Sequence, residues 1–333
     1  MPGQAPQAMA GGHEPLLDIS GLSVRFSGLT VVDRVSMTLR EGEVLGIVGE
    51  SGSGKSVTAQ AVMGLLPASA RVTADRLTLM GESLLGAGEK RLQRLRGAAM
   101  SMIFQEPMTA LNPVLTIGRQ ISETLIRHGM ASQGGALQRS AELLSRVGIP
   151  SPRDKLDDYP HQLSGGMRQR VMIAIAIACN PRLLFADEPT TALDVTIQAQ
   201  ILELLRELQQ EYRMGIILIS HDLGVVSSFA DRVLVMYAGR IVEDASAAAV
   251  FAGPAHPYTR GLLASRPSAL RDIPRLVAIP GTVPPAFDLP SGCRFRNRCG
   301  FAEPACAEVD PPRIEIGTAH GAACLKPVHE ART

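Results

Sequence analysis

The segment Gly49-Glu-Ser-Gly-Ser-Gly-Lys-Ser56 constrains the fold of this chain more than any other part of it. The segment matches the pattern G-x-x-x-x-G-K-[S/T] in full. The apolar run at 43–48 predicts a buried strand before it, and residues 56–66 predict a helix that stops before Pro67. A strand, a glycine loop and a helix in this order form the context that phosphate binding requires.

The residue types in this loop indicate how a nucleoside triphosphate would be held. Glycines let the backbone N–H groups curl around phosphate oxygens, and the helix points the positive end of its dipole at them. We expect Lys55 to bridge the β- and γ-phosphates of ATP and the Ser56 hydroxyl to bind Mg²⁺. The expected ATP-binding residues here are Gly49, Glu50, Ser51, Gly52, Ser53, Gly54, Lys55, Ser56 and Val57.

A second apolar run, at 182–186, ends in Asp187 and Glu188. An Asp-Glu pair alone is usually a solvated turn, but here both acids follow a predicted buried strand. We expect Asp187 to hold Mg²⁺ through water and Glu188 to act as the general base that polarises the attacking water. The loop and these two acids together predict a site for ATP hydrolysis.

Composition limits the other classes of function. The 333 residues carry 33 basic and 32 acidic side chains, a net charge of +1, so no global basic field favours nucleic acid as a partner. The longest apolar run, at 171–179, is too short to cross a bilayer. No Lys or Arg precedes Arg25 and no signal core is visible, so we expect a soluble, cytoplasmic chain. A role at a membrane would need partner subunits.

Alternating strand-like and helical segments in the first 245 residues predict an α/β fold with a mainly parallel core sheet. Residues 1–14 are rich in Pro, Gly, Ala and Gln and predict a disordered tail. Apolar residues recur at helical spacing in 117–128, 137–147 and 197–213. From about His256 onward Pro and Gly become frequent, which indicates a separate C-terminal segment.

The segment Leu163-Ser-Gly-Gly-Met167, followed by Arg168-Gln-Arg170 and an apolar helix, resembles the signature motif of ATP-binding-cassette (ABC) ATPases. The resemblance implies an ABC ATPase fold: a P-loop, RecA-like core with an antiparallel β subdomain and a helical subdomain. The nucleotide-binding domain would span 15–255, with the helical subdomain at about 106–172, and a cysteine-containing C-terminal extension would span 256–333. In this family the signature faces the γ-phosphate held by the opposite subunit, so the residues acting in trans would be Leu163, Ser164, Gly165, Gly166 and Met167.

The resemblance also implies roles for four further positions. Phe26 lies where the family places an aromatic ring that stacks on adenine, with a core Phe as the alternative. Gln105 matches the Q-loop glutamine, which senses Mg²⁺ and the attacking water. Asp194 lies in the D-loop, which crosses the dimer interface, and His221 matches the switch histidine that contacts the γ-phosphate. The implied catalytic residues are Glu188, His221 and Gln105, and the implied magnesium ligands are Ser56, Gln105 and Asp187.

Longer segments point to one branch of the family. The segments at 104–120, 164–171 and 187–200 closely resemble dipeptide and oligopeptide importers, and the Met-ending signature resembles their D-type ATPase subunit. The resemblance implies a heterodimer with an F-type ATPase subunit, two transmembrane permeases and, indirectly, a substrate-binding protein. It places the chain on the cytoplasmic face of the bacterial inner (plasma) membrane. The alternatives are the same motor for nickel, glutathione or another small solute, and a non-transport ABC ATPase.

Four of the five cysteines lie near the C-terminus with the spacing C-x5-C-x6-C-x17-C: Cys293, Cys299, Cys306 and Cys324. The spacing leaves zinc, an iron–sulfur cluster and simple thiols open. The family resemblance favours a [4Fe–4S] cluster. Arg294, Arg296 and Arg298 would lower the pKa of the thiols and offset the charge of a cluster, unless this stretch is a solvated basic loop.

Overall fold

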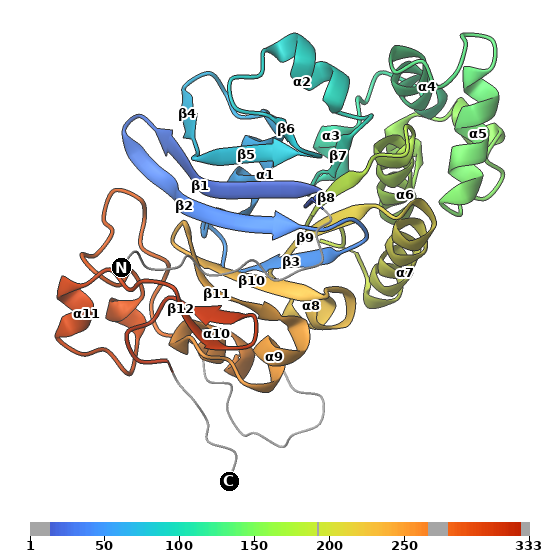
Figure 1. Ribbon diagram of the computed structural model, residues 1–333. Coiled ribbons are helices and arrows are strands. Elements are labelled where there is room, and N and C mark those ends of the chain that lie inside the picture. The colour runs from blue at the N-terminus through green and yellow to red at the C-terminus, as the bar shows by residue number, and fades with distance from the viewer. Residues whose placement is uncertain (1–13, 192, 266–278, 328–333) are drawn as a thin grey trace.

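The computed structural model describes residues 14–191, 193–265 and 279–327, which form two β-sheets with helices around them (Figure 1). The larger sheet has eight strands in the order β12-β13-β11-β10-β3-β9-β8-β7. The smaller sheet has five, in the order β2-β1-β5-β6 with β4 also pairing to β1. The predicted disordered tail lies outside the described residues, apart from Glu14.

Parallel strands form the centre of the larger sheet. They are β3 (Val44–Val48), β7 (Met100–Ile103), β8 (Leu183–Asp187), β9 (Gly215–Ser220) and β10 (Arg232–Tyr237). Nearly every residue of these strands is buried, because helices and the second sheet cover both faces. The predicted mainly parallel core sheet is confirmed, and the carboxyl ends of its strands share one edge.

The C-terminal segment adds two strands to this same sheet. They are β12 (Ile314–Gly317) and β13 (His320–Ala322), and β13 pairs antiparallel with β11 (Arg240–Ser246). The new strands are short, and β12 is largely exposed, so they carry little of the apolar signal that marks a strand in sequence. The segment therefore packs directly on the core of the molecule.

The smaller sheet is antiparallel and covers one face of the larger one. Its strands are β1 (Leu17–Phe26), β2 (Leu29–Leu39), β4 (Ala70–Thr73), β5 (Arg76–Leu79) and β6 (Glu82–Ser83). A hydrophobic cluster between the sheets takes in Leu45 and Ile47 of β3 and also α1 (Lys55–Met63). The alternate residues Val44 and Val48 face a second cluster under the remaining helices, as the two-residue period of a strand requires.

The remaining helices lie around the two sheets: α4 and α5 lie at one end, α11 lies at the opposite end, and α2 lies beside the smaller sheet (Figure 1). The bounds of α4, α5 and α7 agree to within two residues with the segments predicted from helical spacing. Among the described residues, none of the helices has the length and apolar character needed to span a bilayer. The helices are α2 (Glu89–Leu95), α3 (Pro107–Ala110), α4 (Ile117–Arg127), α5 (Ala136–Arg146), α6 (Gly165–Ile177), α7 (Val195–Tyr212), α8 (Leu223–Phe229), α9 (Ala247–Ala252), α10 (Pro257–Ala264) and α11 (Ala305–Glu308), with single 3₁₀ turns η1 (Asp154–Leu156), η2 (Pro160–Gln162) and η3 (Arg296–Arg298).

Candidate active site

The glycine loop joins the end of β3 to the start of α1, as the sequence predicts. A Cβ added at Gly49 would lie 2.2 Å from the carbonyl oxygen of Met236, so only glycine fits there. Gly54 is the N-cap of α1 with φ +100°, and it has no side chain that could cap the helix. The first N–H groups of α1 therefore point out of the helix end without a side-chain acceptor, which makes this end an anion site.

Lys55 is the charged group at the centre of this loop. Its side chain is buried, and Nζ donates hydrogen bonds to the carbonyl oxygens of Gly49 (2.7 Å) and Glu50 (3.0 Å). Burial lowers the pKa of Lys55, and the carboxylates of Glu188 and Asp187 act in the opposite direction. The ammonium thus lies between the curled loop and two acids, where a phosphate would meet it.

The other loop residues differ in exposure. Ser51 and Gly52 are exposed, whereas Ser53 is fully buried and its hydroxyl has no hydrogen-bond partner among the described residues. Val57 is half-buried and packs on the cluster between the sheets. The exposed tip is the part of the loop that is open to a ligand.

Ser56 at the start of α1 and Asp187 at the end of β8, both predicted magnesium ligands, are in direct contact. The Ser56 hydroxyl donates a hydrogen bond of 2.9 Å to Oδ1 of Asp187. Burial raises the pKa of Asp187, and the Ser56 hydrogen bond opposes that shift. A hydroxyl and a buried carboxylate are oxygen donors of the kind that Mg²⁺ prefers, so the residues fit this ion.

Glu188 is the meeting point of the predicted catalytic residues. Its Oε2 accepts hydrogen bonds from Gln105 Nε2 (3.1 Å) and Thr191 Oγ1 (2.8 Å), and its Oε1 lies 3.0 Å from His221 Nδ1. Burial alone would raise the pKa of Glu188, but the hydrogen bonds from Thr191 and His221 bring it below its usual value. The side chain is thus held as a carboxylate that can accept a proton.

These side chains come from loops that follow neighbouring parallel strands. Gln105 follows β7, Asp187 ends β8 with Glu188 directly after it, and His221 follows β9. Because the carboxyl ends of parallel strands meet at one sheet edge, the fold assembles the cluster beside the glycine loop after β3. The contact from Thr191 was not predicted, since a threonine three residues after Glu188 carries no recognisable signal of its own.

The signature and D-loop residues lie apart from this cluster. Ser164 is the N-cap of α6 and accepts a hydrogen bond from the Met167 N–H. Asp194 caps α7 in the same way through the N–H of Ile197. Of the remaining signature residues, Leu163 is buried, Gly165 is exposed and Gly166 is half-buried. In the described part of the chain, none of these side chains hydrogen-bonds to the glycine loop. The α6 end is a second helix N-terminus open to an anion.

Phe26 ends β1 and is half-buried against the cluster between the two sheets. Its ring is therefore partly open to solvent, and it makes no ring contact with another aromatic among the residues the structure describes. A half-buried ring is compatible with an adenine contact and with a place at the edge of the core, so its role as an adenine contact stays a prediction.

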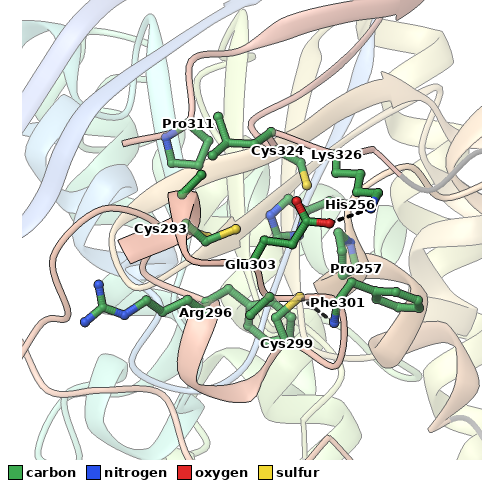
Figure 2. Close-up of a pocket in the computed structure, with 15 residues that line it drawn as sticks. His256, Pro257, Cys293, Arg296, Cys299, Phe301, Glu303, Pro311, Cys324 and Lys326 are labelled. Atoms are coloured by element: carbon green, nitrogen blue, oxygen red, sulfur yellow. Dashed lines mark hydrogen bonds and ion pairs between the residues drawn. The ribbon is translucent and has the colours of Figure 1, made fainter. Parts of the chain in front are cut away.

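The predicted iron–sulfur or zinc site at the C-terminal cysteines is wrong. Within 14–191, 193–265 and 279–327, no group of three or more His, Cys, Asp or Glu side chains could hold a metal ion. The four cysteines instead line a mainly apolar pocket together with Phe301 and Pro311 (Figure 2). Burial raises the pKa of Cys293, Cys299 and Cys324, which favours the protonated thiols in this pocket.

The arginines that were expected to support a cluster are used elsewhere. Arg294 pairs with Asp33 on β2, and Arg298 pairs with Glu50 in the glycine loop. Arg296 donates to the hydroxyl of Ser291 (2.7 Å) and to the Ala307 carbonyl oxygen (3.2 Å). The charges of Arg294 and Arg298 are therefore neutralised by carboxylates away from the thiols, and the Arg296 guanidinium is held by neutral groups.

Comparisons with known proteins agree with the geometry. Residues 32–191 match the ABC transporter family, and 242–306 match the oligopeptide/dipeptide transporter C-terminal region. The chain is 49% identical to the dipeptide transport ATP-binding protein DppD of Escherichia coli (strain K12), over 95% of this chain and 98% of that protein. It is 50% identical to DppD of Haemophilus influenzae, over 95% of this chain and 96% of that one.

Solved structures give the same result for the fold. A dimeric bacterial ABC transporter cassette, MJ0796, superposes with a TM-score of 0.62 at 26% identity, covering 69% of this chain and 98% of that one. CbiO1 of Clostridium perfringens, part of an ABC transporter complex, gives 0.61 at 29% identity, covering 72% and 92%. The chain therefore belongs to the ATP-binding subunits of ABC transporters, in the branch that carries the oligopeptide/dipeptide transporter C-terminal region.

Proposed function

We propose that this chain is the ATP-hydrolysing motor subunit of an importer for dipeptides or oligopeptides. The observation that carries the proposal is the near-50% identity, over 95% of the chain, to dipeptide transport ATP-binding proteins. The cluster of Lys55, Ser56, Asp187 and Glu188 at one sheet edge supports it, because it offers each group that ATP hydrolysis needs.

ATP would bind with its phosphates on the N-terminus of α1. The loop N–H groups and the Lys55 ammonium would hold the β- and γ-phosphates, and the Phe26 ring would stack on adenine. Ser56, Asp187 and Gln105 would hold Mg²⁺ directly or through water. When bound, Mg²⁺ neutralises charge on the phosphate oxygens.

Hydrolysis would then use the Glu188 carboxylate as the base. Water attacks the γ-phosphorus, its proton passes to Glu188, and the bond from the γ-phosphorus to the β–γ bridging oxygen breaks to give ADP and phosphate. Gln105 and His221, which contact Glu188 in this structure, would position the attacking water and the γ-phosphate at the same place. The lowered pKa of Glu188 supports this role, because the base must be unprotonated at neutral pH.

The exposed signature turn at the start of α6 would complete a site on a second ATPase subunit. We propose that this partner is a distinct, F-type chain, so that the motor is a heterodimer. Asp194 would lie near the shared interface, next to Val195, whose side chain is 83% exposed. Closure of two such sites around ATP would be the event that drives transport.

The remaining parts of the assembly follow from the same proposal. Residues 15–255 would form the nucleotide-binding domain, the helical part at about 106–172 would contact two transmembrane permeases, and 256–333 would form an extension. A substrate-binding protein would deliver the peptide to the permeases. This arrangement would hold the chain on the cytoplasmic face of a bacterial inner membrane.

Uptake measurements test the substrate. The chain, co-expressed with its partner ATPase subunit, permeases and binding protein in bacteria that lack their own peptide importers, should support uptake of a labelled dipeptide, and Lys55→Ala should abolish it. Nickel and glutathione serve as the competing solutes. Uptake of either one without uptake of peptides would refute the proposed substrate class and leave the motor role intact.

A further inference from the structure

The C-terminal segment reaches the phosphate-binding loop through Arg298. This side chain lies at the end of η3 and is only 5% exposed. Its Nη1 lies 2.6 Å from Oε2 of Glu50 and its Nη2 lies 2.9 Å from Oε1, so the guanidinium donates a hydrogen bond to each carboxylate oxygen. Such two-pronged pairs are among the strongest polar contacts in proteins and define the orientation of both partners.

Arg298 is itself anchored on the side away from the loop. Its Nε donates to the carbonyl oxygen of Pro280 (2.7 Å), and Nη2 also donates to that of Gly281 (3.2 Å). The guanidinium carbon lies 5.7 Å from the centre of the Tyr237 ring, within the range of a cation–π contact. The Arg298 side chain thus connects the C-terminal segment to Glu50 in a fixed orientation.

A second contact holds the backbone of the same loop residue. The N–H of Glu50 donates to the hydroxyl of Tyr258 on α10 (2.9 Å). Tyr258 is fully buried, with ring centres 4.6 Å from Tyr237 and 5.3 Å from Phe295, so this hydroxyl has little freedom to move. The carbonyl oxygen of Glu50 in turn accepts a hydrogen bond from Lys55, the predicted phosphate-binding lysine.

We propose that Arg298 is a positioning residue for the nucleotide: through Glu50 it holds the loop at 49–56 in the shape that binds phosphate. A loop with three glycines is otherwise free to take many shapes, and ordering it in advance removes that entropy loss from binding. The pair also neutralises the Glu50 carboxylate, which belongs to the loop that would hold the triphosphate. The inference rests on the proposed nucleotide site and adds to it that the C-terminal segment sets the affinity for ATP.

The test measures the dissociation constant of the full chain for the non-hydrolysable analogue AMP-PNP with Mg²⁺, by titration calorimetry. We expect Arg298→Met to weaken binding by about tenfold, because it both loosens the loop and leaves Glu50 unpaired. Arg298→Lys should weaken binding less, since it keeps the positive charge but loses the paired hydrogen bonds to the two carboxylate oxygens. Arg296→Met is the matched control and should leave the affinity unchanged, because Arg296 on the same turn bonds to Ser291 and Ala307 rather than to the glycine loop.

A double-mutant cycle separates positioning from a general structural role. In a Glu50→Gln chain the partner carboxylate is gone, so adding Arg298→Met should change the affinity less than about twofold. An equal loss in both backgrounds would overturn the proposal, as would wild-type affinity in Arg298→Met. If Arg298→Met does not fold, Arg298→Lys carries the same cycle. A loss of affinity with Glu50 present, and none in the Glu50→Gln background, then supports the proposal, and any other pattern overturns it.

Lys55→Ala distinguishes failure of this inference from failure of the proposed site. Loss of binding in Lys55→Ala together with normal binding in Arg298→Met would refute only the positioning role. Normal binding in Lys55→Ala would refute the nucleotide site itself.

Discussion

The catalytic edge and the cysteine pocket use their polar groups in opposite ways. At the edge, side chains from different strands bind one another: Ser56 bonds to Asp187, and Gln105 and His221 both contact Glu188. In the pocket the thiols lie beside aromatic rings and proline, and burial raises the pKa of Cys293 above its usual value. At the edge the polar groups are held in charged form by one another, whereas in the pocket burial favours the neutral form of the thiols.

The difference comes from the elements that carry the residues. The catalytic residues follow neighbouring parallel strands, and the sheet brings those strand ends together whatever the loop sequences are. The cysteines lie on separate pieces: Cys293 and Cys299 flank η3, Cys306 lies in α11 and Cys324 follows β13. Their spacing in sequence therefore says little about whether their sulfur atoms converge.

The largest expected effect comes from removing the base at the catalytic edge. Glu188→Gln keeps the size and hydrogen-bonding capacity of the side chain but cannot accept the proton from water. We expect phosphate release by the assembled transporter to fall by at least about 100-fold, with the affinity for Mg²⁺-ATP retained. Glu203→Gln, at an exposed position on α7, is the control and should behave as wild type. Turnover near the wild-type rate in Glu188→Gln would show that another group is the base.

Much of this edge could be predicted from the sequence because its motifs include their structural context. The apolar runs before Gly49 and Asp187 marked buried strands, and the order of the motifs placed their ends side by side. The hydrogen bond from Thr191 to Glu188 could not be foreseen, since it depends on a turn that no residue pattern marks. The ion pair between Arg298 and Glu50 could not be foreseen either, because the two residues are 248 positions apart in the sequence.

Three of the strands that escaped prediction lack periodic apolar residues. Strands β4 and β6 have no buried residues, and β12 is mostly exposed, so pairing with neighbours rather than burial defines them. At the cysteines, composition suggested chemistry that needs convergent sulfur atoms and nearby positive charge. The fold brings the cysteines to one pocket but forms no metal-binding group among the residues it describes, and Arg294 and Arg298 are committed to Asp33 and Glu50. A residue type with a known chemistry predicts a site only where the backbone brings its partners together.

A smaller effect should come from His256, which lines the cysteine pocket. It is 1% exposed, caps α10 by accepting the Tyr258 N–H, and burial lowers its pKa to about 3 from an ordinary value of 6.5. As pH falls below 6.5, His256 takes up a proton in the unfolded chain but not in the folded chain. The free energy of unfolding therefore decreases progressively down to pH 3. We expect this residue to remove about 2 kcal/mol of unfolding free energy between pH 7.5 and pH 5.

His256→Asn isolates that contribution, because asparagine can still cap the helix but does not titrate. Urea unfolding at pH 7.5 and at pH 5 gives the change in unfolding free energy between the two pH values for the wild type and for the variant. The variant should lose about 2 kcal/mol less than wild type between the two pH values. Identical losses in the two chains would mean that His256 is protonated in the folded pocket, and the pocket would then resemble the catalytic edge more closely than we infer.

The smallest expected effect concerns the thiols themselves. Because burial raises the pKa of Cys293, Cys299 and Cys324, each holds its proton at pH 7.5 more firmly than a free cysteine. Iodoacetamide should therefore alkylate them a few times more slowly than the same residues in urea-unfolded protein, as followed by peptide mass spectrometry.

Cys179, which is 7% exposed and whose pKa is also raised by burial, is the internal reference and should react slowly as well. If the pocket thiols react faster than Cys179, this shows only that the reagent reaches them more easily. If they react faster than the same thiols in the unfolded chain, the folded pocket must stabilise thiolates. Such stabilised thiolates, or iron or zinc retained stoichiometrically through anaerobic purification, would place charge in the pocket and remove the contrast with the catalytic edge.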